Sequence, residues 1–361
     1  MNKSNINYKD FCIAKEESII YSLKLMDKLK RKLLIILDDN KFYGLLSIGD
    51  LQRAIIANKP LEGSIKTILR NNIKTGTPID DVENIKLIML EHRMEFFPII
   101  DEHKEIQTIY FWEDLFQDKI PKVARKLNCP VIIMAGGEGR RLKPLTNIIP
   151  KPLVPIAEKT IIEKIMDNFV EVGSHNFFLS VNYKASIIKH YLTELNNVNY
   201  NIQYFQEDKP LGTAGSLSLI KNLIKETFFV SNCDIIIEQD YSEIYNYHIN
   251  NKNAITVVAA MKHYQIPYGI IYTEENGKLI TLQEKPEITY KINSGFYIVE
   301  PKVLDLIPEN TVFHFTDLIE RAMINNYTIG VFPVSEKSWI DIGTWREYLQ
   351  SQPFNENNLL K

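Results

Sequence analysis

The sequence contains little cysteine and no long apolar run. Its three cysteines, Cys12, Cys129 and Cys233, are odd in number and far apart in 361 residues. This pattern matches neither a disulfide framework nor a zinc site, so we expect inert buried thiols in a reducing cytoplasm. No apolar run approaches the ~18 residues that span a bilayer. The first residues, "MNKSNINYKDF", lack the apolar segment of a signal peptide. We therefore expect a cytoplasmic protein without a membrane partner.

An excess of either charge is also missing. The formal net charge is −3, which gives no basis for expecting a nucleic-acid partner. The composition, with 45% hydrophobic and 24% charged residues, is that of an ordinary globular protein. A chain of 361 residues is too long for one small core, so we expect two domains.

The first ~120 residues contain an internal repeat. The stretch "LLIILDDNKFYGLLSIGDLQRAI" (33–55) is echoed by "FFPIIDEHKEIQTIYFWEDLF" (96–116). Each copy has an apolar strand, an acidic turn with a lysine, a second strand and an acidic helix start. An amphipathic helical stretch precedes each copy. The pattern predicts a helix–strand–strand–helix unit that occurs twice.

This repeat resembles a tandem pair of cystathionine-β-synthase-type (CBS) modules, an α+β domain over residues 1–120. In such modules a Ser or Thr three residues before an Asp holds phosphate and ribose. Ser47 and Asp50 match that spacing, whereas the second copy has Tyr110 and a shifted Glu113–Asp114 pair. The resemblance implies an adenine nucleotide at Ser47 and Asp50. The alternative is a pair that serves only for dimerisation or docking.

A charged segment bracketed by prolines separates this region from the rest, and we place the linker at residues 121–130. Beyond it, apolar strand-like runs alternate with helical stretches over residues 131–350, before a tail at 351–361. Such alternation predicts an α/β domain with a mixed, mostly parallel sheet wrapped by helices. Ligands then bind at the carboxyl ends of the strands.

The first run, "VIIMAGG", leads into a glycine-rich loop. Gly136, Gly137 and Gly139 follow it directly. At a strand end, glycines let backbone amides approach a phosphate closely. A tight turn without a ligand would explain the glycines equally well. No Lys–Ser/Thr follows at the spacing of a Walker loop.

Cations follow the glycines at once. Arg140 and Arg141 come next, and Lys151 lies between two prolines. An arginine behind a glycine loop brings a bidentate fork to phosphate oxygens, and flanking prolines pin the backbone of the lysine. Each cation alone would be a solvated surface residue. Together they predict a phosphate site.

The stretch "MAGGEGRRLKPLTNIIPKPL" (134–153) resembles the signature of sugar-1-phosphate nucleotidyltransferases, G-G-x-G-T-R-L-x-P-L-T followed by P-K-P. Arg140 replaces the usual threonine. The resemblance covers residues 130 to about 350 and implies a Rossmann-like domain of the GT-A type.

Further motifs follow in the order of that family. The resemblance implies three groups of site residues: a nucleotide site at Glu207, Leu211, Gly212, Thr213 and Ala214, together with Gly136, Gly137, Gly139 and Arg140; a sugar-phosphate site at Tyr268, Gly269, Glu284, Lys285 and Asn293; and a metal site at Asp234 and Asp341. Taken singly, each aspartate would be a helix cap or loop carboxylate, and Glu284–Lys285 a salt-bridged turn.

The chemistry also explains these residue types. An anionic sugar phosphate must attack an anionic α-phosphorus, so fixed cations and a divalent metal oppose the barrier. Asp234 and Asp341 are hard oxygen ligands for Mg²⁺ or Mn²⁺. We expect Arg141 to grip the β- and γ-phosphates and Lys151 to neutralise charge near the α-phosphate. Alignment and charge compensation suffice without a covalent nucleophile.

The residues around "LGTAG" indicate which nucleoside triphosphate donates the transferred group. This loop, with Glu207 before it, resembles that of guanylyltransferases, and a carboxylate can accept two hydrogen bonds from guanine. An exposed loop glutamate is the alternative. A CBS pair ahead of such a domain resembles the bacterial glucosamine-1-phosphate guanylyltransferases of GDP-legionaminic acid synthesis. We therefore expect GTP and glucosamine 1-phosphate as substrates of a homo-oligomeric enzyme.

Two alternatives remain open at this stage. The same motifs fit mannose-1-phosphate guanylyltransferases or other pyrophosphorylases that use CTP, UTP or dTTP. A nucleotide-binding regulatory protein without turnover would keep the same fold. The presence of Arg141, Lys151, Asp234 and Asp341 argues against that last alternative.

Overall fold

The computed structural model describes residues 8–116 and 126–352. The chain divides into two compact units, Met1–Lys122 and Val123–Lys361. Half of the predicted linker (121–130) and most of the predicted tail (351–361) lie outside the described residues. No described helix combines the length and apolar character needed to cross a bilayer.

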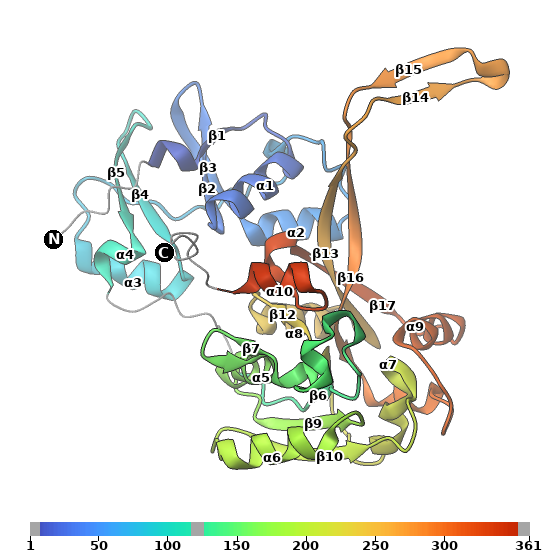
Figure 1. Cartoon of the computed structure of the whole chain (residues 1–361). Coiled ribbons are helices and arrows are strands. Elements are labelled where there is room, and N and C mark those ends of the chain that lie inside the picture. The colour runs from blue at the N-terminus through green and yellow to red at the C-terminus, as the bar shows by residue number, and fades with distance from the viewer. Residues whose placement is uncertain (1–7, 117–125, 353–361) are drawn as a thin grey trace, which may run out of the picture. The chain divides into compact units, whose positions relative to one another are not determined.

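The first unit contains two copies of one arrangement of helices and strands (Figure 1). The first copy consists of β1 (Cys12–Ala14), α1 (Ile19–Leu29), β2 (Leu33–Asp38), β3 (Lys41–Ser47) and α2 (Ile48–Ile56). The second consists of a bridge between Gly76 and Ile99, α3 (Val82–His92), β4 (Phe96–Ile100), β5 (Ile106–Phe111) and α4 (Trp112–Leu115). In both copies the first strand or bridge is parallel to the next strand, which forms an antiparallel hairpin with the third. The predicted repeat is confirmed, whereas the CBS identification stays a prediction.

Side chains from both copies meet in this unit. The rings of Phe11, Phe96 and Phe111 pack together at centroid separations of 5.9 to 6.2 Å. Arg31 of the first copy lies over two of these rings and bonds Glu113 of the second at 2.8 Å. An apolar cluster with an ion pair at its rim therefore joins the two copies.

The second unit is built on a seven-stranded sheet with the order β10-β9-β6-β11-β16-β13-β17. Six strands run parallel and β16 runs against them, as predicted for a mixed, mostly parallel sheet. The strands of the sheet are β6 (Val131–Met134), β9 (Asn176–Val181), β10 (Asn201–Gln206), β11 (Phe228–Asn232), β13 (Ile255–Gln265), β16 (Glu287–Val299) and β17 (Ile329–Ser335).

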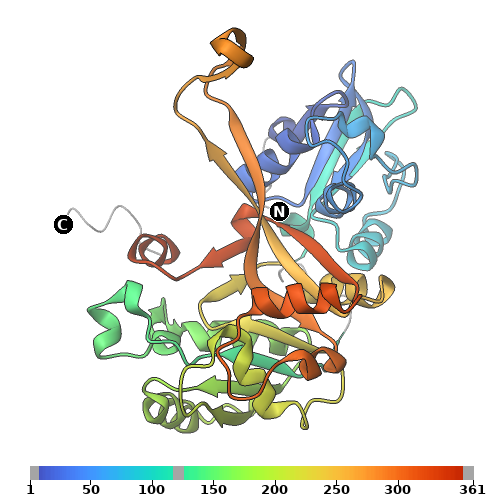
Figure 2. The same ribbon diagram turned by 90° about the vertical axis from the view of Figure 1, so that its right-hand side faces the viewer.

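Helices cover both faces of this sheet (Figures 1 and 2). One face packs on α5 (Ile161–Glu171), α6 (Ala185–Leu195) and α8 (Tyr241–Asn250). The other packs on α7 (Gly212–Gly215), the 3₁₀ turns η6 (Ser216–Ile220) and η8 (Pro301–Leu306), and α9 (Phe315–Ile324). Side chains alternate across a strand, so Ile132 and Ile133 enter different cores. The apolar stretch "GSLSLIKNLI" (215–224) forms no long helix and instead contains the end of α7 and the 3₁₀ turn η6.

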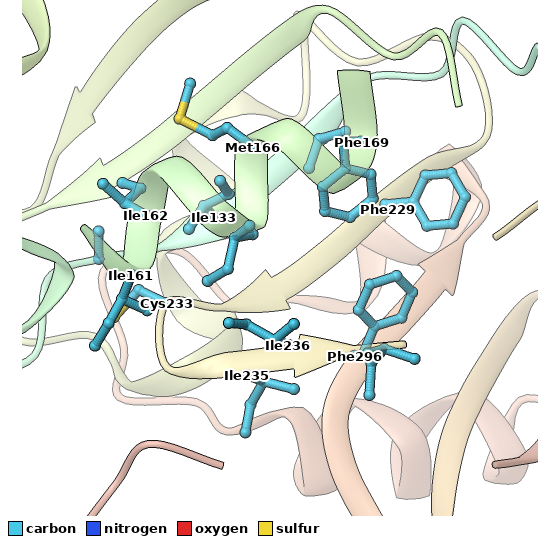
Figure 3. Packing of buried hydrophobic residues seen from close by; sticks show 14 of the residues in the cluster. Ile133, Ile161, Ile162, Met166, Phe169, Phe229, Cys233, Ile235, Ile236 and Phe296 are labelled. Atoms are coloured by element: carbon cyan, nitrogen blue, oxygen red, sulfur yellow. The ribbon is translucent and has the colours of Figure 1, made fainter. Parts of the chain in front are cut away.

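The core on the α5 face is aromatic at its centre (Figure 3). The ring of Phe169 from α5 stacks on Phe296 of β16 at 5.7 Å and lies 5.3 Å from Phe229 of β11. A capping box between Thr160 and Glu163 begins α5. The strands that carry the candidate site residues are thus anchored by fully buried rings.

Small elements complete the second unit. They are the hairpins β7 (Pro155–Ile156) with β8 (Lys159–Thr160) and β14 (Ile270–Thr273) with β15 (Leu279–Gln283), the pair β12 (Ile235–Ile237) with β18 (Trp339–Asp341), and α10 (Trp345–Ser351). The cysteines are free, and burial raises the pKa of the Cys233 thiol to about 12. Cys129 and Cys233 are buried, as expected, whereas Cys12 is only partly buried.

Candidate active site

The glycine loop follows β6 at the carboxyl edge of the sheet. Gly139 has a φ of 65°, and a Cβ there would lie 2.8 Å from Thr146 Cγ2. The buried hydroxyl of Thr146 donates to the Gly139 carbonyl at 2.9 Å, which holds the loop in place. A Cβ at Gly137 would meet nothing within 4 Å. The loop is therefore fixed at one end and open at Gly137, where a phosphate can approach the backbone.

The two arginines after the loop have different surroundings. Arg140 is exposed and donates two hydrogen bonds to Glu138, at 2.8 and 3.1 Å. Arg141 lines a cavity of about 350 Å³. A Cβ at Gly343 would lie 2.7 Å from both Arg141 Nη2 and Asp341 Oδ1. The glycine thus lets a guanidinium and a carboxylate approach the same point.

The two predicted metal ligands lie where the β12–β18 pair meets the end of β11, with Asp234 in the turn between β11 and β12. Asp234 follows β11, and Asp341 ends β18, which pairs with β12 so that Asp341 is opposite Ile235. The amide of Ile342 donates to the carbonyl of Asp234 at 2.9 Å. Lys151 lies between two prolines at the start of the 3₁₀ turn η5 (Lys151–Leu153). It is buried and forms an ion pair with Asp234. The fold therefore brings both carboxylates and the lysine together.

The electrostatics distinguish the two carboxylates. Asp234 has Lys151 as a partner, whereas the Oδ1 atom of Asp341 is buried with no hydrogen-bond partner among the described residues. Burial, followed by the charge of Asp234, raises the pKa of Asp341 to about 6. A cation held between the two carboxylates would relieve both the burial of this oxygen and the repulsion from Asp234.

The donor set fits a metal that keeps most of its ligands outside the protein. In the described part of the chain, no group of three or more His, Cys, Asp or Glu side chains is placed to hold an ion. Mg²⁺ is commonly held by one or two carboxylates, with waters and substrate phosphates as its other ligands. Asp234 and Asp341 match that requirement.

The predicted nucleotide loop packs on the segment before α9. The amides of Ala214 and Gly215 donate to the Phe313 carbonyl at 3.0 and 2.9 Å, and the Thr213 hydroxyl accepts from the Phe315 amide at 3.0 Å. Gly212 has a φ of 81°, and a Cβ there would lie 2.7 Å from the Phe313 carbonyl oxygen. Leu211 and Ala214 are buried below the loop, and Thr213 lines the cavity.

Glu207 is buried rather than exposed. One carboxylate oxygen accepts from the Ser180 hydroxyl at 2.7 Å, and the other accepts from the Leu211 amide at 2.8 Å. A Cβ on Gly136 would lie 3.3 Å from its Oε1 atom. Glu207 therefore ties the nucleotide loop to β9 beside the glycine loop, and it is not among the residues that line the cavity.

The cavity contains residues that the sequence analysis did not single out. His314 and Thr316 at the start of α9 line it, as do Asn232, Tyr297 and Trp339. Gly295 has a φ of 80° and leaves room for the side-chain amide of Asn232. A Cβ at position 295 would lie 2.4 Å from Asn232 Nδ2. The stretch "HFTD" (314–317) comes directly before an amphipathic run and is a helix-start signal. This signal could have identified His314 and Thr316.

The predicted sugar-phosphate residues are divided between two places. Asn293 lines the cavity and accepts from the Gly295 amide at 3.1 Å. Tyr268, Gly269, Glu284 and Lys285 lie together at the base of the β14–β15 hairpin and are not among the lining residues. The structure does not bring these four to the cavity.

In the first unit, Ser47 and Asp50 form the capping box that begins α2. The Ser47 amide and hydroxyl donate to Asp50 at 2.8 and 2.6 Å. Arg53 and Arg70 also pair with this carboxylate, Arg70 through its Nε at 2.8 Å. The predicted pair is therefore adjacent in space and engaged with two half-exposed arginines.

The family of the second unit follows from comparison with known proteins. The family described as "Nucleotidyl transferase" matches residues 130–358. The chain belongs to this nucleotidyl transferase family. The predicted membership of a nucleotidyltransferase family is confirmed, and so is the mixed α/β fold of that unit.

Relatives carry more specific names. The chain is 33% identical over 235 residues to the mannose-1-phosphate guanylyltransferase catalytic subunit beta of Dictyostelium discoideum, covering 63% of this chain and 65% of that one. The Xenopus tropicalis protein of the same name is 35% identical over 225 residues, covering 60% and 62%. The chain thus spans less than two thirds of the length of these relatives.

A solved structure shares the fold. It is a putative glucose-1-phosphate thymidylyltransferase from Bacillus anthracis, described in complex with a sucrose. The TM-score is 0.50 at 21% identity, and the match covers 63% of this chain and 96% of that one.

Proposed function

We propose that this chain transfers a nucleoside monophosphate from GTP to a hexose 1-phosphate and releases pyrophosphate. The observation that carries the proposal is the convergence of Arg141, Lys151, Asp234 and Asp341 at one edge of the sheet, three of them at a cavity. Family membership supports nucleotidyl transfer, and the relatives' names support a guanylyl donor.

The chain's own residues supply charge and alignment. A sugar-phosphate oxygen attacks the α-phosphorus, the bond from that phosphorus to the β-phosphate oxygen breaks, and pyrophosphate leaves. Arg141 offers a planar fork to the departing phosphates. Lys151 is held by Asp234 in a buried position, so its charge is fixed before substrates bind.

Asp234 and Asp341 would hold a divalent cation in this proposal. Bound there, Mg²⁺ or Mn²⁺ supplies charge neutralisation between the phosphate groups of the two substrates. The buried, unpartnered Oδ1 atom of Asp341 is the feature that supports it. The Thr213 loop and the start of α9 would enclose the nucleoside, and Asn293 the sugar.

For the sugar, we place mannose 1-phosphate first because the curated relatives are named for it. Glucosamine 1-phosphate, with a GDP-sugar destined for legionaminic acid, is the second candidate. It is favoured by the repeated unit at residues 12–115, which resembles a CBS pair. In that unit we propose Ser47, Asp50 and Arg70 as a site for an adenine nucleotide.

The test is pyrophosphate release by the full chain over GTP, ATP, CTP and UTP combined with mannose, glucose and glucosamine 1-phosphates. We expect the fastest release with GTP, and loss of release in excess chelator. Asp234→Asn and Asp341→Asn serve as inactive controls. Faster turnover with CTP or UTP would contradict the donor assignment. Absence of release with every pair would favour a regulatory nucleotide-binding protein.

A further inference from the structure

The chain between Arg141 and Lys151 runs along the surface and carries a site residue at each end. We call residues 142–150 the connecting segment. It contains the 3₁₀ turn η4 (Leu145–Asn147), after which Ile148 is 77% exposed. About half of its side chains are exposed, so packing alone fixes it weakly. Other contacts must therefore set where the two cations stand.

Lys184 holds the connecting segment from the turn that follows β9. Its Nζ atom donates to three successive carbonyls, those of Thr146 at 3.4 Å, of Asn147, and of Ile148 at 2.9 Å. Carbonyls at the end of a helical turn lack partners within that turn. An ammonium group has three donors and no acceptor, so Lys184 uses its full capacity on this one turn.

The residue type at position 184 is explained by these contacts and not by the helix that it precedes. Lys184 is the N-cap of α6 with a φ of 53°, and its side chain makes no capping hydrogen bond. A left-handed backbone is unfavourable for a residue with a β-carbon, and Ser, Asp, Asn or Gly is preferred at an N-cap. Local preference thus opposes a lysine here, which indicates a role for its ammonium group.

Thr146 connects Lys184 to the glycine loop. Its carbonyl accepts from Lys184, and its buried hydroxyl donates to the Gly139 carbonyl at 2.9 Å. A Cβ at Gly139 would lie 3.1 Å from the Cβ of Lys151, so the loop packs directly on the lysine of the site. A shift of Thr146 would therefore displace the glycine loop and Lys151 together.

A second contact comes from α10, which follows the metal-ligand candidate Asp341 in the chain. The indole Nε1 atom of Trp345 donates to the Lys143 carbonyl at 2.9 Å. The helices α6 and α10 lie apart on the second unit (Figure 1). The connecting segment is thus held at two points by side chains that are distant in sequence.

We propose that Lys184 and Trp345 are positioning residues for nucleotidyl transfer. They fix the connecting segment and thereby place Arg141 and Lys151 against the phosphate groups of the nucleoside triphosphate. Neither is among the residues that line the cavity, so each acts through the backbone of the segment. Cations fixed before the substrate binds need no reorganisation during the reaction. This inference rests on the proposed function, because it assigns both side chains to that reaction.

The first test is steady-state kinetics of Lys184→Met, which keeps the length of the side chain and removes its donors. We expect kcat to fall at least about tenfold, with the KM for the sugar phosphate within about twofold of the parent value. Lys184→Arg, which retains charge and several donors, should recover most of kcat. An unchanged kcat for Lys184→Met, or an arginine variant no better than methionine, would overturn the proposal.

Lys189→Met is the matched control. Lys189 is on the same helix, but its Nζ atom donates to Gln206 of β10 at 3.1 Å and lies over the Tyr204 ring. Its kcat should equal that of the parent. A loss as large as that of Lys184→Met would mean that any lysine of α6 has this effect, and it would refute the specific contact.

Trp345→Phe tests the second contact. The change keeps an aromatic ring beside Tyr348 and removes the N–H donor. We expect kcat to fall about three- to tenfold, as for the loss of one neutral hydrogen bond. An unchanged kcat would refute the role of Trp345.

Hydrogen exchange separates failure of this proposal from failure of the proposed function. The amides of Asn147, Ile148 and Ile149 donate to carbonyls within the connecting segment at 3.0 to 3.1 Å. In Lys184→Met they should exchange at least about tenfold faster, while the amides of β11 keep their rates. Equal acceleration in β11 would mean general destabilisation and would overturn the proposal.

The two measurements together distinguish the remaining outcomes. An active parent whose Lys184→Met variant has a faster-exchanging segment and an unchanged kcat would overturn the positioning role and leave the proposed function intact. A parent that releases no pyrophosphate with any substrate pair would reject both.

Discussion

Asp341→Asn should stabilise the metal-free protein while abolishing its activity. Asp341 is a half-buried carboxylate next to Asp234, and its pKa is raised to about 6 from 3.8 in the unfolded chain. Between these pH values the native state binds more protons than the unfolded state. The group's contribution therefore lowers the free energy of unfolding as pH rises through this window, and the full penalty applies above pH 6.

The magnitude follows from that pKa difference. Each pKa unit corresponds to about 1.36 kcal/mol, so the upper limit is about 3 kcal/mol. Water reaches part of the carboxyl group and screens it, which reduces our expectation to about 1–2 kcal/mol. Asparagine is isosteric and uncharged, so the variant should gain this amount at pH 8 and almost nothing near pH 4.

Scanning calorimetry in EDTA at pH 4, 6 and 8 measures the effect. The quantity compared is the midpoint temperature of the unfolding transition that differs between the parent and the variant. Asp234→Asn is the matched control with the opposite sign, because it leaves the buried Lys151 unpaired and should cost about 3 kcal/mol. An Asp341→Asn variant that is no more stable than the parent at pH 8 would refute the argument. It would mean that the carboxylate already has a partner without metal.

Three further predictions concern activity. Gly343→Ala should lower kcat at least about tenfold with little loss of stability, because its Cβ would meet Arg141 and Asp341 at 2.7 Å; steady-state kinetics with an unchanged kcat would contradict this. Glu207→Gln should reduce kcat/KM for GTP about tenfold and narrow the gap to ATP; an unchanged GTP/ATP ratio leaves Glu207 only the role of holding the loop. A chain that starts at Lys122 should still fold and release pyrophosphate, since the cavity and its carboxylates lie in the second unit; a folded but inactive truncation would show that the first unit completes the site.

The sequence by itself determined the local elements of this protein. The repeated strands of the first unit and the strands "FFLSV", "NIQYF" and "FFVSN" lie where their β-branched and aromatic runs predict them. The glycine loop and Lys151 between its prolines were also readable, because turn geometry depends on a few adjacent residues. Glu207 lies beside the "LGTAG" loop, as its motif predicts, but the motif did not indicate that its side chain is buried.

Only the tertiary structure decided which side chains meet. The pairing of β12 with β18 puts Asp234 next to Asp341, and the ion pair with Lys151 bridges 83 positions of sequence. The same packing separates Arg140, which pairs with Glu138, from Arg141, and it leaves Glu284 at the base of the β14–β15 hairpin. Contacts of this kind depend on strand register and on the burial of whole faces, which local patterns do not encode.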